Sequence, residues 1–320
     1  MVAFPDHPNA TFRENTVVSQ ATHARHTSMK KLPWLLPLPV LLFTLSLWGA
    51  SSFAQAAQAA ELAETVLMVP KTSGFFSTEL ETTVYRPAGD GPFPVVVINH
   101  GKAPGNPKFQ ARYRPVVAAR YFVARGYAVV VPMRQGFSQS SGAYIAGGCN
   151  VGGNGREQAV DVVATLDYVV AQPWADKTRI LVAGQSHGGW TTLAFGTLGY
   201  PGVKGLVDFA GGLRQDQCAG WQQGLVAAAA EYGAKTPPTL PSLWFYGDND
   251  SYWPTDTWHA MFDAYSAGGA DTRMVAFGSF ESDSHRMFGS PRGAPVWQPE
   301  MTKFLQKIGM PYEVQAEASR

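Results

Sequence analysis

One hexapeptide in the second half of the chain has the residue types and spacing of a catalytic nucleophile. Residues 184–189 read Gly-Gln-Ser-His-Gly-Gly and follow an apolar run at 178–183. A Gly-x-Ser-x-Gly sequence between a buried strand and a helix is typical of a sharp turn that lifts the serine hydroxyl above the sheet. Gly184 and Gly188 leave room for the neighbouring strand and helix, and Ser186 is the predicted nucleophile. A glycine-rich turn without catalytic function is the alternative.

A serine hydroxyl needs a base, and the base needs an acid that orients it. The base is expected after the last predicted strand, where His285 lies in Ser-His-Arg-Met-Phe. The acid is expected after the preceding strand, in a turn that contains both Asp248 and Asp250. Asp250 lies deeper in this loop and is the preferred acid, while the other carboxylate suits a plain tight turn.

The negative charge that develops on an attacked carbonyl oxygen needs two preorganised N–H donors. One is expected from the backbone of His187, directly after the predicted nucleophile. The second is expected from the backbone of Lys102, in the Asn-His-Gly-Lys turn after the apolar run at 94–99. The side chain of His187 is expected to shape the pocket. For His100, a hydrogen-bonded tether of the turn is preferred to a catalytic role.

Short apolar runs alternate with helical patterns along most of the chain. The predicted strands are at 62–69, 78–86, 94–99, 128–132, 178–183, 203–209, 241–246 and 272–278. The predicted helices are at 112–125, 156–172, 188–198, 217–232, 256–267 and 297–308. This alternation indicates an α/β domain over residues 60–320, with a mostly parallel eight-stranded sheet and helices on both faces. In such a sheet the reacting groups follow the carboxyl ends of strands, as all these candidates do.

Taken in order, the motifs resemble a known superfamily. They are His100-Gly101, the hexapeptide at 184–189, Gly-x-x-Asp ending at Asp250, Ser-His-x-x-Phe at 284–288, and Pro132-x-Arg134-x-Gly136. Over about residues 65–310 the chain resembles the dienelactone-hydrolase-like branch of the α/β-hydrolase superfamily, and it is similar to the catalytic domains of prolyl-oligopeptidase-type peptidases. The resemblance implies the α/β-hydrolase fold and the Ser186–His285–Asp250 triad. Dienelactone hydrolases use a cysteine nucleophile, so Ser186 argues against that particular activity.

The combined pattern predicts hydrolysis of a small-molecule carboxylic ester through an acyl-enzyme, with no metal or organic cofactor. A peptidase or amidase with the same triad is the alternative. Peptidases of the prolyl-oligopeptidase type carry a large N-terminal propeller, for which these 320 residues leave no room, so the ester is preferred. A binding protein on a catalytically inactive form of the fold is a third hypothesis, which the intact motifs disfavour.

The charge and composition fit a globular enzyme. Hydrophobic residues make up 45% of the chain and charged residues 15%, which favours a substantial core over disorder. The formal net charge is +1 and there is no basic stripe, so the sequence predicts no nucleic-acid partner. Composition gives no prediction of the oligomeric state.

The first sixty residues have the pattern of an export signal. From Met29 the chain reads Met-Lys-Lys, a Leu-rich stretch over 32–48, and then an alanine-rich segment with small residues at the spacing of a cleavage site. This order predicts a signal peptide at 29–59, with 1–28 upstream of the true start and a periplasmic or secreted mature protein. A transmembrane anchor is the alternative. Three prolines interrupt the apolar stretch, so no stable membrane insertion is expected after cleavage.

Export makes the two cysteines informative. Cys149 and Cys218 form an even pair, for which a disulfide is preferred to two buried thiols. Both follow strands that are expected to lie about three positions apart, so their loops must arch toward each other. The segment 138–155 is predicted to be an unstructured loop that the disulfide pins over the pocket. Four aromatic residues are the other candidates for the pocket wall: Trp190, Trp221, Tyr252 and Trp253.

Overall fold

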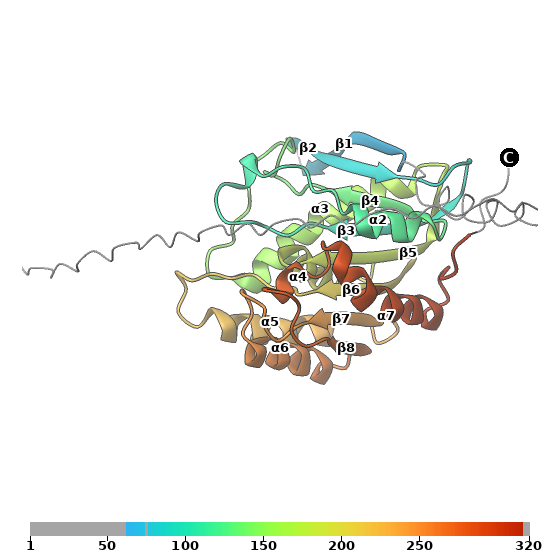
Figure 1. Ribbon diagram of the computed structural model, residues 1–320. Helices are drawn as coiled ribbons and strands as arrows, with labels where there is room; N and C mark the ends of the chain where they lie inside the picture. The colour runs from blue at the N-terminus through green and yellow to red at the C-terminus, as the bar shows by residue number, and fades with distance from the viewer. Residues whose placement is uncertain (1–61, 74–75, 316–320) are drawn as a thin grey trace, which may run out of the picture. The chain divides into compact units, whose positions relative to one another are not determined.

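The computed structural model describes residues 62–73 and 76–315, which contain one eight-stranded sheet (Figure 1). The strand order is β1-β2-β4-β3-β5-β6-β7-β8. The strands are β1 (Glu64–Ser73), β2 (Phe76–Tyr85), β3 (Phe93–Asn99), β4 (Ala128–Pro132), β5 (Ala175–Gln185), β6 (Val203–Phe209), β7 (Ser242–Tyr246) and β8 (Thr272–Ala276). Pairing is antiparallel for β1 with β2 and for β2 with β4, and it is parallel from β4 to β8. The predicted mostly parallel sheet of eight strands is confirmed.

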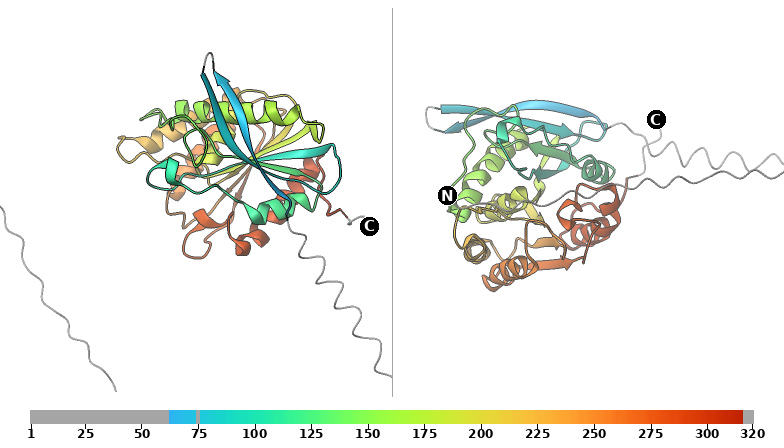
Figure 2. Two further views of the ribbon diagram at one scale, coloured as in Figure 1. Left: turned by 90° about the horizontal axis from the view of Figure 1, so that it is seen from above. Right: turned by 60° about the vertical axis from the view of Figure 1, so that its left-hand side comes forward.

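Helices cover both faces of this sheet, as the view from above in Figure 2 shows. The α-helices are α2 (Val116–Val123), α3 (Val151–Val170), α4 (His187–Gly196), α5 (Trp221–Lys235), α6 (Thr255–Ala267) and α7 (Ala294–Lys307). The short 3₁₀ helices are η1 (Pro107–Phe109), η2 (Ser284–Arg286) and η3 (Pro291–Gly293). Helices α3 to α6 pack on one face, and α2 and α7 pack on the other.

Alternation along the central strands explains why two helical layers form. In β3, Val95 and Val97 belong to the core under α3 to α6, whereas Val96 and Ile98 belong to the core under α2 and α7. Successive strand residues point to opposite faces, so a continuous apolar run needs cover on both sides. The central strands are therefore held between the two helical layers, and the carboxyl ends of these strands can position catalytic residues.

Helix α3 begins earlier than the sequence predicts. It starts at Val151, so the last part of the segment 138–155 is helical and the predicted start at 156 is wrong. Glycines disfavour a helix, but packing overrides that preference here. The side chain of Asn150 accepts a hydrogen bond from the first turn, and a Cβ at Gly155 would lie 2.3 Å from the Tyr232 hydroxyl. The glycine is needed because the two helices approach so closely.

The predicted disulfide is present. Cys149 and Cys218 are joined with an S–S distance of 1.99 Å and a Cα–Cα distance of 5.6 Å. Cys149 follows β4 and Cys218 follows β6, and β3 and β5 lie between these strands in the sheet. The two loops therefore arch over two intervening strands to meet, as expected.

The described residues belong to one compact unit over residues 60–320. The predicted upstream segment at 1–28 and the predicted signal peptide at 29–59 lie outside the described residues. Across 62–73 and 76–315, none of the helices has the length and hydropathy needed to cross a membrane.

Candidate active site

Ser186 stands at the turn between β5 and α4. Its backbone has φ 57° and ψ −125°, a region that a residue with a side chain adopts only when its surroundings enforce it. The surroundings do so here, because the Ser186 N–H donates to the Phe209 carbonyl at 2.9 Å and the Ser186 carbonyl accepts from the Trp190 N–H at 3.0 Å. The strand on one side and the helix on the other thus hold the serine in this strained position.

The two elbow glycines are required by close backbone contacts. A Cβ at Gly184 would lie 2.1 Å from the carbonyl oxygen of Gly188. A Cβ at Gly188 would lie 2.1 Å from the carbonyl oxygen of Asn99, at the end of β3. Neither position admits a side chain, so strand β5, helix α4 and strand β3 meet directly beneath Ser186.

His285 and Asp250 lie together at the ends of β8 and β7. The Asp250 carboxylate accepts a hydrogen bond from His285 Nδ1 at 2.9 Å, and its side chain is fully buried. Its other oxygen accepts from the backbone N–H groups of Tyr252 and Trp253, at 2.8 and 3.0 Å. Because Nδ1 donates to the carboxylate, Nε2 is the ring nitrogen left to act as a base. Asp248, the other carboxylate of this turn, is exposed.

Two further side chains, Asp283 and Asn249, hold together the loops that carry Asp250 and His285, and no sequence motif points to them. Asp283 Oδ1 accepts from the backbone N–H groups of His285 and Ser251, at 3.0 and 3.1 Å. Burial raises the pKa of Asp283, but these bonds and one from the Ser251 hydroxyl outweigh it and lower the pKa overall. Asn249 bonds the backbone of Phe280 and Glu281 in the neighbouring loop. The sequence marks these two residues only by their position, since Asn249 precedes Asp250 and Asp283 lies two residues before His285.

The turn after β3 lies against the nucleophile. A Cβ at Gly101 would come 3.2 Å from the Ser186 Cβ and 2.7 Å from Gln185 Oε1, so the glycine allows the turn to lie close to the nucleophile. Within the described residues, the N–H groups of Lys102 and His187 donate to no protein acceptor. Both residues therefore offer a free N–H beside Ser186, where the sequence predicts the oxyanion donors.

Two buried histidines fasten this part of the site. His100 Nε2 accepts from the Arg134 backbone N–H at 3.0 Å, so Nδ1 carries the proton and donates to the Gly101 carbonyl at 2.7 Å. His187 Nε2 donates to Asn154 Oδ1 at 2.7 Å, while Nδ1 faces the Arg134 guanidinium at 3.3 Å. Burial and then the charge of Arg134 hold the pKa of both rings well below the ordinary histidine value. Both are neutral tethers, as was expected for His100.

A cavity of about 430 Å³ opens beside Ser186 and His285. Its other lining residues are His100, Gly101, Lys102, Ala103, Gln110, Ala111, Tyr113, Met133, Gln185 and Tyr252. None of them is an aspartate or a glutamate, and Lys102 is the one lysine or arginine. The Lys102 ammonium donates to the carbonyl oxygens of Ala103 and Gly105, at 3.3 and 3.5 Å, and lies 5.8 Å from the centre of the Tyr144 ring. Burial lowers its pKa. Lys102 is therefore the one lining residue with a side chain that is charged at neutral pH.

Most of the predicted pocket wall lies elsewhere. No residue of the segment 138–155 lines the cavity, and of the four predicted aromatics only Tyr252 does. Trp190 and Trp253 are buried in the core, where their indole N–H groups donate to backbone carbonyls, and Trp221 packs edge-on against Trp253. The disulfide joins this loop to the segment just before α5, and Tyr144 of the same loop lies beside the Lys102 ammonium. Among the described residues, no group of three or more His, Cys, Asp or Glu side chains could hold a metal ion.

Comparisons with known proteins agree with this architecture. Residues 74–260, more than half of the chain, match the family model of the X-Pro dipeptidyl-peptidases (S15 family). No match was found among curated protein sequences.

Solved structures with the same fold include both hydrolases and peptidases. A Klebsiella pneumoniae protein assigned as a dienelactone hydrolase has 18% identity and a TM-score of 0.53, covering 77% of this chain and 99% of its own. The Pyrococcus horikoshii acylaminoacyl peptidase has 18% identity and a TM-score of 0.60, covering 83% of this chain and only 45% of its own. Est1E from Butyrivibrio proteoclasticus, with ferulic acid bound, has 17% identity and a TM-score of 0.54, covering 75% and 98%. The chain belongs to the X-Pro dipeptidyl-peptidase (S15) family and is a serine hydrolase of the α/β-hydrolase fold.

Proposed function

We propose that the protein hydrolyses small carboxylic esters through an acyl-enzyme formed on Ser186. His285 Nε2 takes the serine proton as the hydroxyl attacks the carbonyl carbon, and it returns that proton to the departing alkoxide. Asp250 holds the imidazole by its bond to Nδ1 and stabilises the imidazolium that forms. A water molecule, activated by the same histidine, then releases the acid and restores Ser186.

The tetrahedral intermediate carries its negative charge on the former carbonyl oxygen. The free N–H groups of Lys102 and His187 are the donors proposed for it, since both lie beside the nucleophile. His187 is also the first residue of helix α4, so the positive end of the helix dipole adds to the same effect. Two N–H donors without a protein acceptor and a helix N-terminus would favour charge development at this point.

The charge of the cavity wall supports an ester over an N-terminal dipeptide as the substrate. A peptidase that removes dipeptides must bind a free α-ammonium group, and a desolvated cation needs an anionic partner. No aspartate or glutamate lines the cavity, and its one lysine or arginine is Lys102. An ammonium substrate would be repelled, whereas a neutral or negatively charged ester would not. This is the observation that carries the proposal.

The first experiment compares substrates on the wild-type protein. p-Nitrophenyl acetate and butyrate should be cleaved with kcat/KM far above that for Ala-Pro-p-nitroanilide, with Ser186→Ala as the blank. Because an activated ester is intrinsically the more reactive compound, the N-acetylated anilide serves as a second reference. Efficient cleavage of the free anilide, with little cleavage of the acetylated one, would establish a dipeptidyl peptidase and reject the ester proposal.

The second experiment isolates the charge of Lys102. Substrates are the phenyl acetates that carry a carboxylate or a carboxamide at the meta position, which differ in charge but little in shape. The wild type should prefer the carboxylate by about tenfold in kcat/KM. Lys102→Met, which keeps the backbone N–H, should remove this preference, and Lys102→Glu should reverse it. An unchanged ratio in both variants would mean that the lysine does not act on the substrate.

We further propose that the mature protein works outside the cytoplasm. The Cys149–Cys218 disulfide requires an oxidising compartment to form and persist, and the pattern over residues 29–59 is that of a signal peptide. Mass spectrometry of the protein from the periplasm and the medium should find a start after Ala54, Ala56 or Ala59. A protein that retains residues 29–59 in the cytoplasm would contradict export.

A further inference from the structure

Arg134 donates to both sides of the proposed oxyanion hole. It follows β4, is completely buried, and uses each part of its guanidinium as a donor. Nη1 donates to the His100 carbonyl at 2.7 Å, Nη2 to His187 Nδ1 at 3.3 Å, and Nε to Gln158 Oε1 at 2.8 Å. Its backbone N–H also donates to His100 Nε2 at 3.0 Å.

Two of these acceptors, the His100 carbonyl and the His187 ring, belong to the segments that carry the two proposed donors. The His100 carbonyl immediately precedes Gly101 and Lys102, whose backbone lies against the nucleophile. His187 immediately follows Ser186, and its own N–H is the other donor. One planar side chain thus links the turn after β3 with the start of α4. A guanidinium fixes several acceptors in one plane, which a lysine cannot do.

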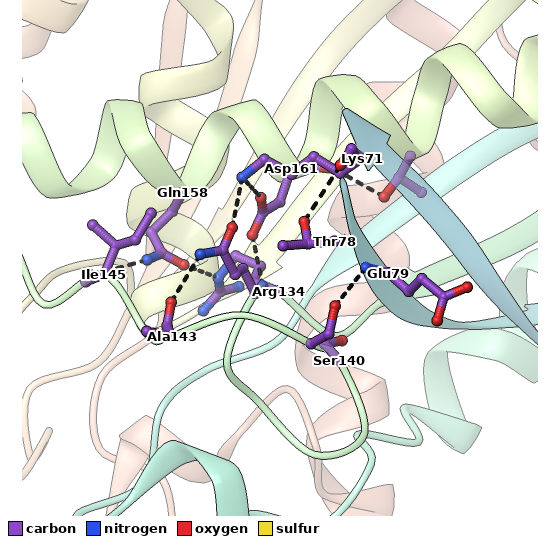
Figure 3. A network of polar contacts seen from close by, with 12 residues as sticks. Lys71, Thr78, Glu79, Arg134, Ser140, Ala143, Ile145, Gln158 and Asp161 are labelled. Atoms are coloured by element: carbon purple, nitrogen blue, oxygen red, sulfur yellow. Dashed lines mark hydrogen bonds and ion pairs between the residues drawn. The ribbon is translucent and has the colours of Figure 1, made fainter. Parts of the chain in front are cut away.

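The positive charge of Arg134 has no direct counter-ion. Within residues 62–73 and 76–315, no carboxylate lies within ion-pair distance of the guanidinium, whose acceptors are all neutral. The nearby carboxylate of Asp161 is already taken by the Lys71 ammonium at 2.5 Å and by the Gln135 N–H at 2.7 Å. Figure 3 shows these two parts of the network side by side, with Arg134 next to Gln158 and Asp161 joined to Lys71.

Burial of a cation without a counter-ion costs desolvation free energy, so the charge of Arg134 is expected to serve a function that offsets this cost. Burial lowers the pKa of Arg134 to about 10, which leaves it charged at neutral pH. A fixed charge in a water-poor region acts over several ångströms on any charge that develops nearby. An oxyanion between Lys102 and His187 would be such a charge.

We infer that Arg134 is a positioning residue that presets both halves of the oxyanion hole and adds a favourable field to the oxyanion. This inference rests on the proposed function. It predicts an effect on the transition state rather than on substrate binding, because Arg134 does not line the cavity. A purely structural role, in which Arg134 only anchors α3 and the loop after β4, predicts lost stability with unchanged catalysis of the folded protein.

The test compares the wild type with Arg134→Met and Arg134→Lys on p-nitrophenyl butyrate. In Arg134→Met, kcat should fall by about 10²-fold with KM changed by less than about threefold. Arg134→Lys keeps the charge but loses the several N–H donors of the guanidinium, so its kcat should lie between those of the wild type and Arg134→Met. Inhibition by a trifluoromethyl ketone, which forms an oxyanion on the serine, should weaken by the same factor as kcat/KM.

Asp161→Asn is the matched control, because it lies in the same buried network but contacts neither His100 nor His187. It should lower the melting temperature while kcat and ketone affinity stay near wild type. If Arg134→Met does not fold, Arg134→Lys alone decides the matter, and its retention of full kcat and ketone affinity would overturn the inference. Reaction of the wild type with a fluorophosphonate separates the failures: no labelling at Ser186 refutes the proposed function, whereas labelling with normal catalysis in the Arg134 variants refutes only this inference.

Discussion

The two sides of the candidate site are built in different ways. The oxyanion side, at the ends of β3, β4 and β5, is held by buried side chains, with Arg134 at the centre and neutral histidines on two sides of it. The acid–base side, at the ends of β7 and β8, consists of two surface loops that hold each other through Asn249 and Asp283. In the proposed reaction, the oxyanion side supplies fixed N–H donors to the oxyanion, and the acid–base side transfers a proton through His285.

This difference has an energetic consequence. Buried polar groups that lose a partner leave unsatisfied donors or charges, so substitutions on the oxyanion side should reduce stability and activity together. The contacts of Asn249 and Asp283 between the two loops are largely exposed and contribute little to stability, so conservative substitutions on the acid–base side should reduce activity with the fold retained.

Ser186→Ala should reduce ester turnover by about 10⁶-fold, which leaves only background hydrolysis. The hydroxyl is lost but the strained elbow remains, since the backbone bonds to Phe209 and Trp190 are unaffected. Hydrolysis of p-nitrophenyl acetate and the melting temperature should be measured on the same preparation. Residual activity above that of heat-inactivated protein would assign the nucleophile elsewhere.

Asp250→Asn should lower kcat by about 10⁴-fold, because the amide cannot orient the imidazole in its reactive tautomer. Asp248→Asn is the matched control, since it is in the same turn but exposed, and it should keep activity within about threefold. Steady-state kinetics of both variants give the ranking. A larger loss of kcat in Asp248→Asn than in Asp250→Asn would assign the acid to Asp248 instead.

The sequence predicts those parts of the molecule that follow from strand order. Ser186, Asp250 and His285 come after the parallel strands β5, β7 and β8, in the order expected for this fold, and parallel strands bring their carboxyl ends to one edge. Local spacing and topology together were sufficient for these residues. The disulfide was predictable for a different reason, because two cysteines in a chain with an export pattern form an even pair.

The sequence did not predict contacts that depend on packing between distant elements. The role proposed for Arg134 depends on acceptors from the turn after β3 and from helices α3 and α4, and no local pattern encodes their meeting. The same holds for Trp190, whose type fits a pocket wall and a core equally well. The predicted start of α3 was wrong because the glycines in its first turns are typical of a loop. Their helical conformation depends on packing against α5, which the local sequence does not show.

Replacing both Cys149 and Cys218 by serine should lower the free energy of unfolding by about 2–4 kcal/mol. The disulfide closes a loop with a sequence separation of 69 residues, so its loss mainly frees the unfolded chain. Neither residue lines the cavity, so kcat/KM of the folded double variant should stay within about threefold. Urea denaturation with parallel kinetics checks both. A large loss of kcat/KM would show that this loop does belong to the oxyanion side.

The smallest effect concerns Asp208, a buried carboxyl at the end of β6 between the two sides. The Tyr246 hydroxyl lies 2.8 Å from Asp208 Oδ2 and 2.7 Å from the Gly211 carbonyl, and it has one proton to donate. Both contacts are satisfied only when Asp208 is protonated and itself donates to the tyrosine. Burial raises the pKa of Asp208 to about 7, although hydrogen bonds from Tyr246 and Gly211 act in the opposite direction.

Asp208→Asn should therefore change how stability depends on pH. The unfolded carboxyl ionises near its ordinary value of about 3.9, whereas the folded one keeps its proton to about pH 7, so its contribution is present at low pH and is lost as pH rises between these values. Asparagine cannot ionise, so the variant should gain stability relative to the wild type between pH 5 and pH 8, by roughly 1–2 kcal/mol after relaxation around the buried charge. Urea denaturation of both proteins at the two pH values measures this difference, in which all other titrating groups cancel. Parallel curves would mean that Asp208 is ionised in the folded protein throughout, and that Tyr246 donates to it and leaves the Gly211 carbonyl without its partner.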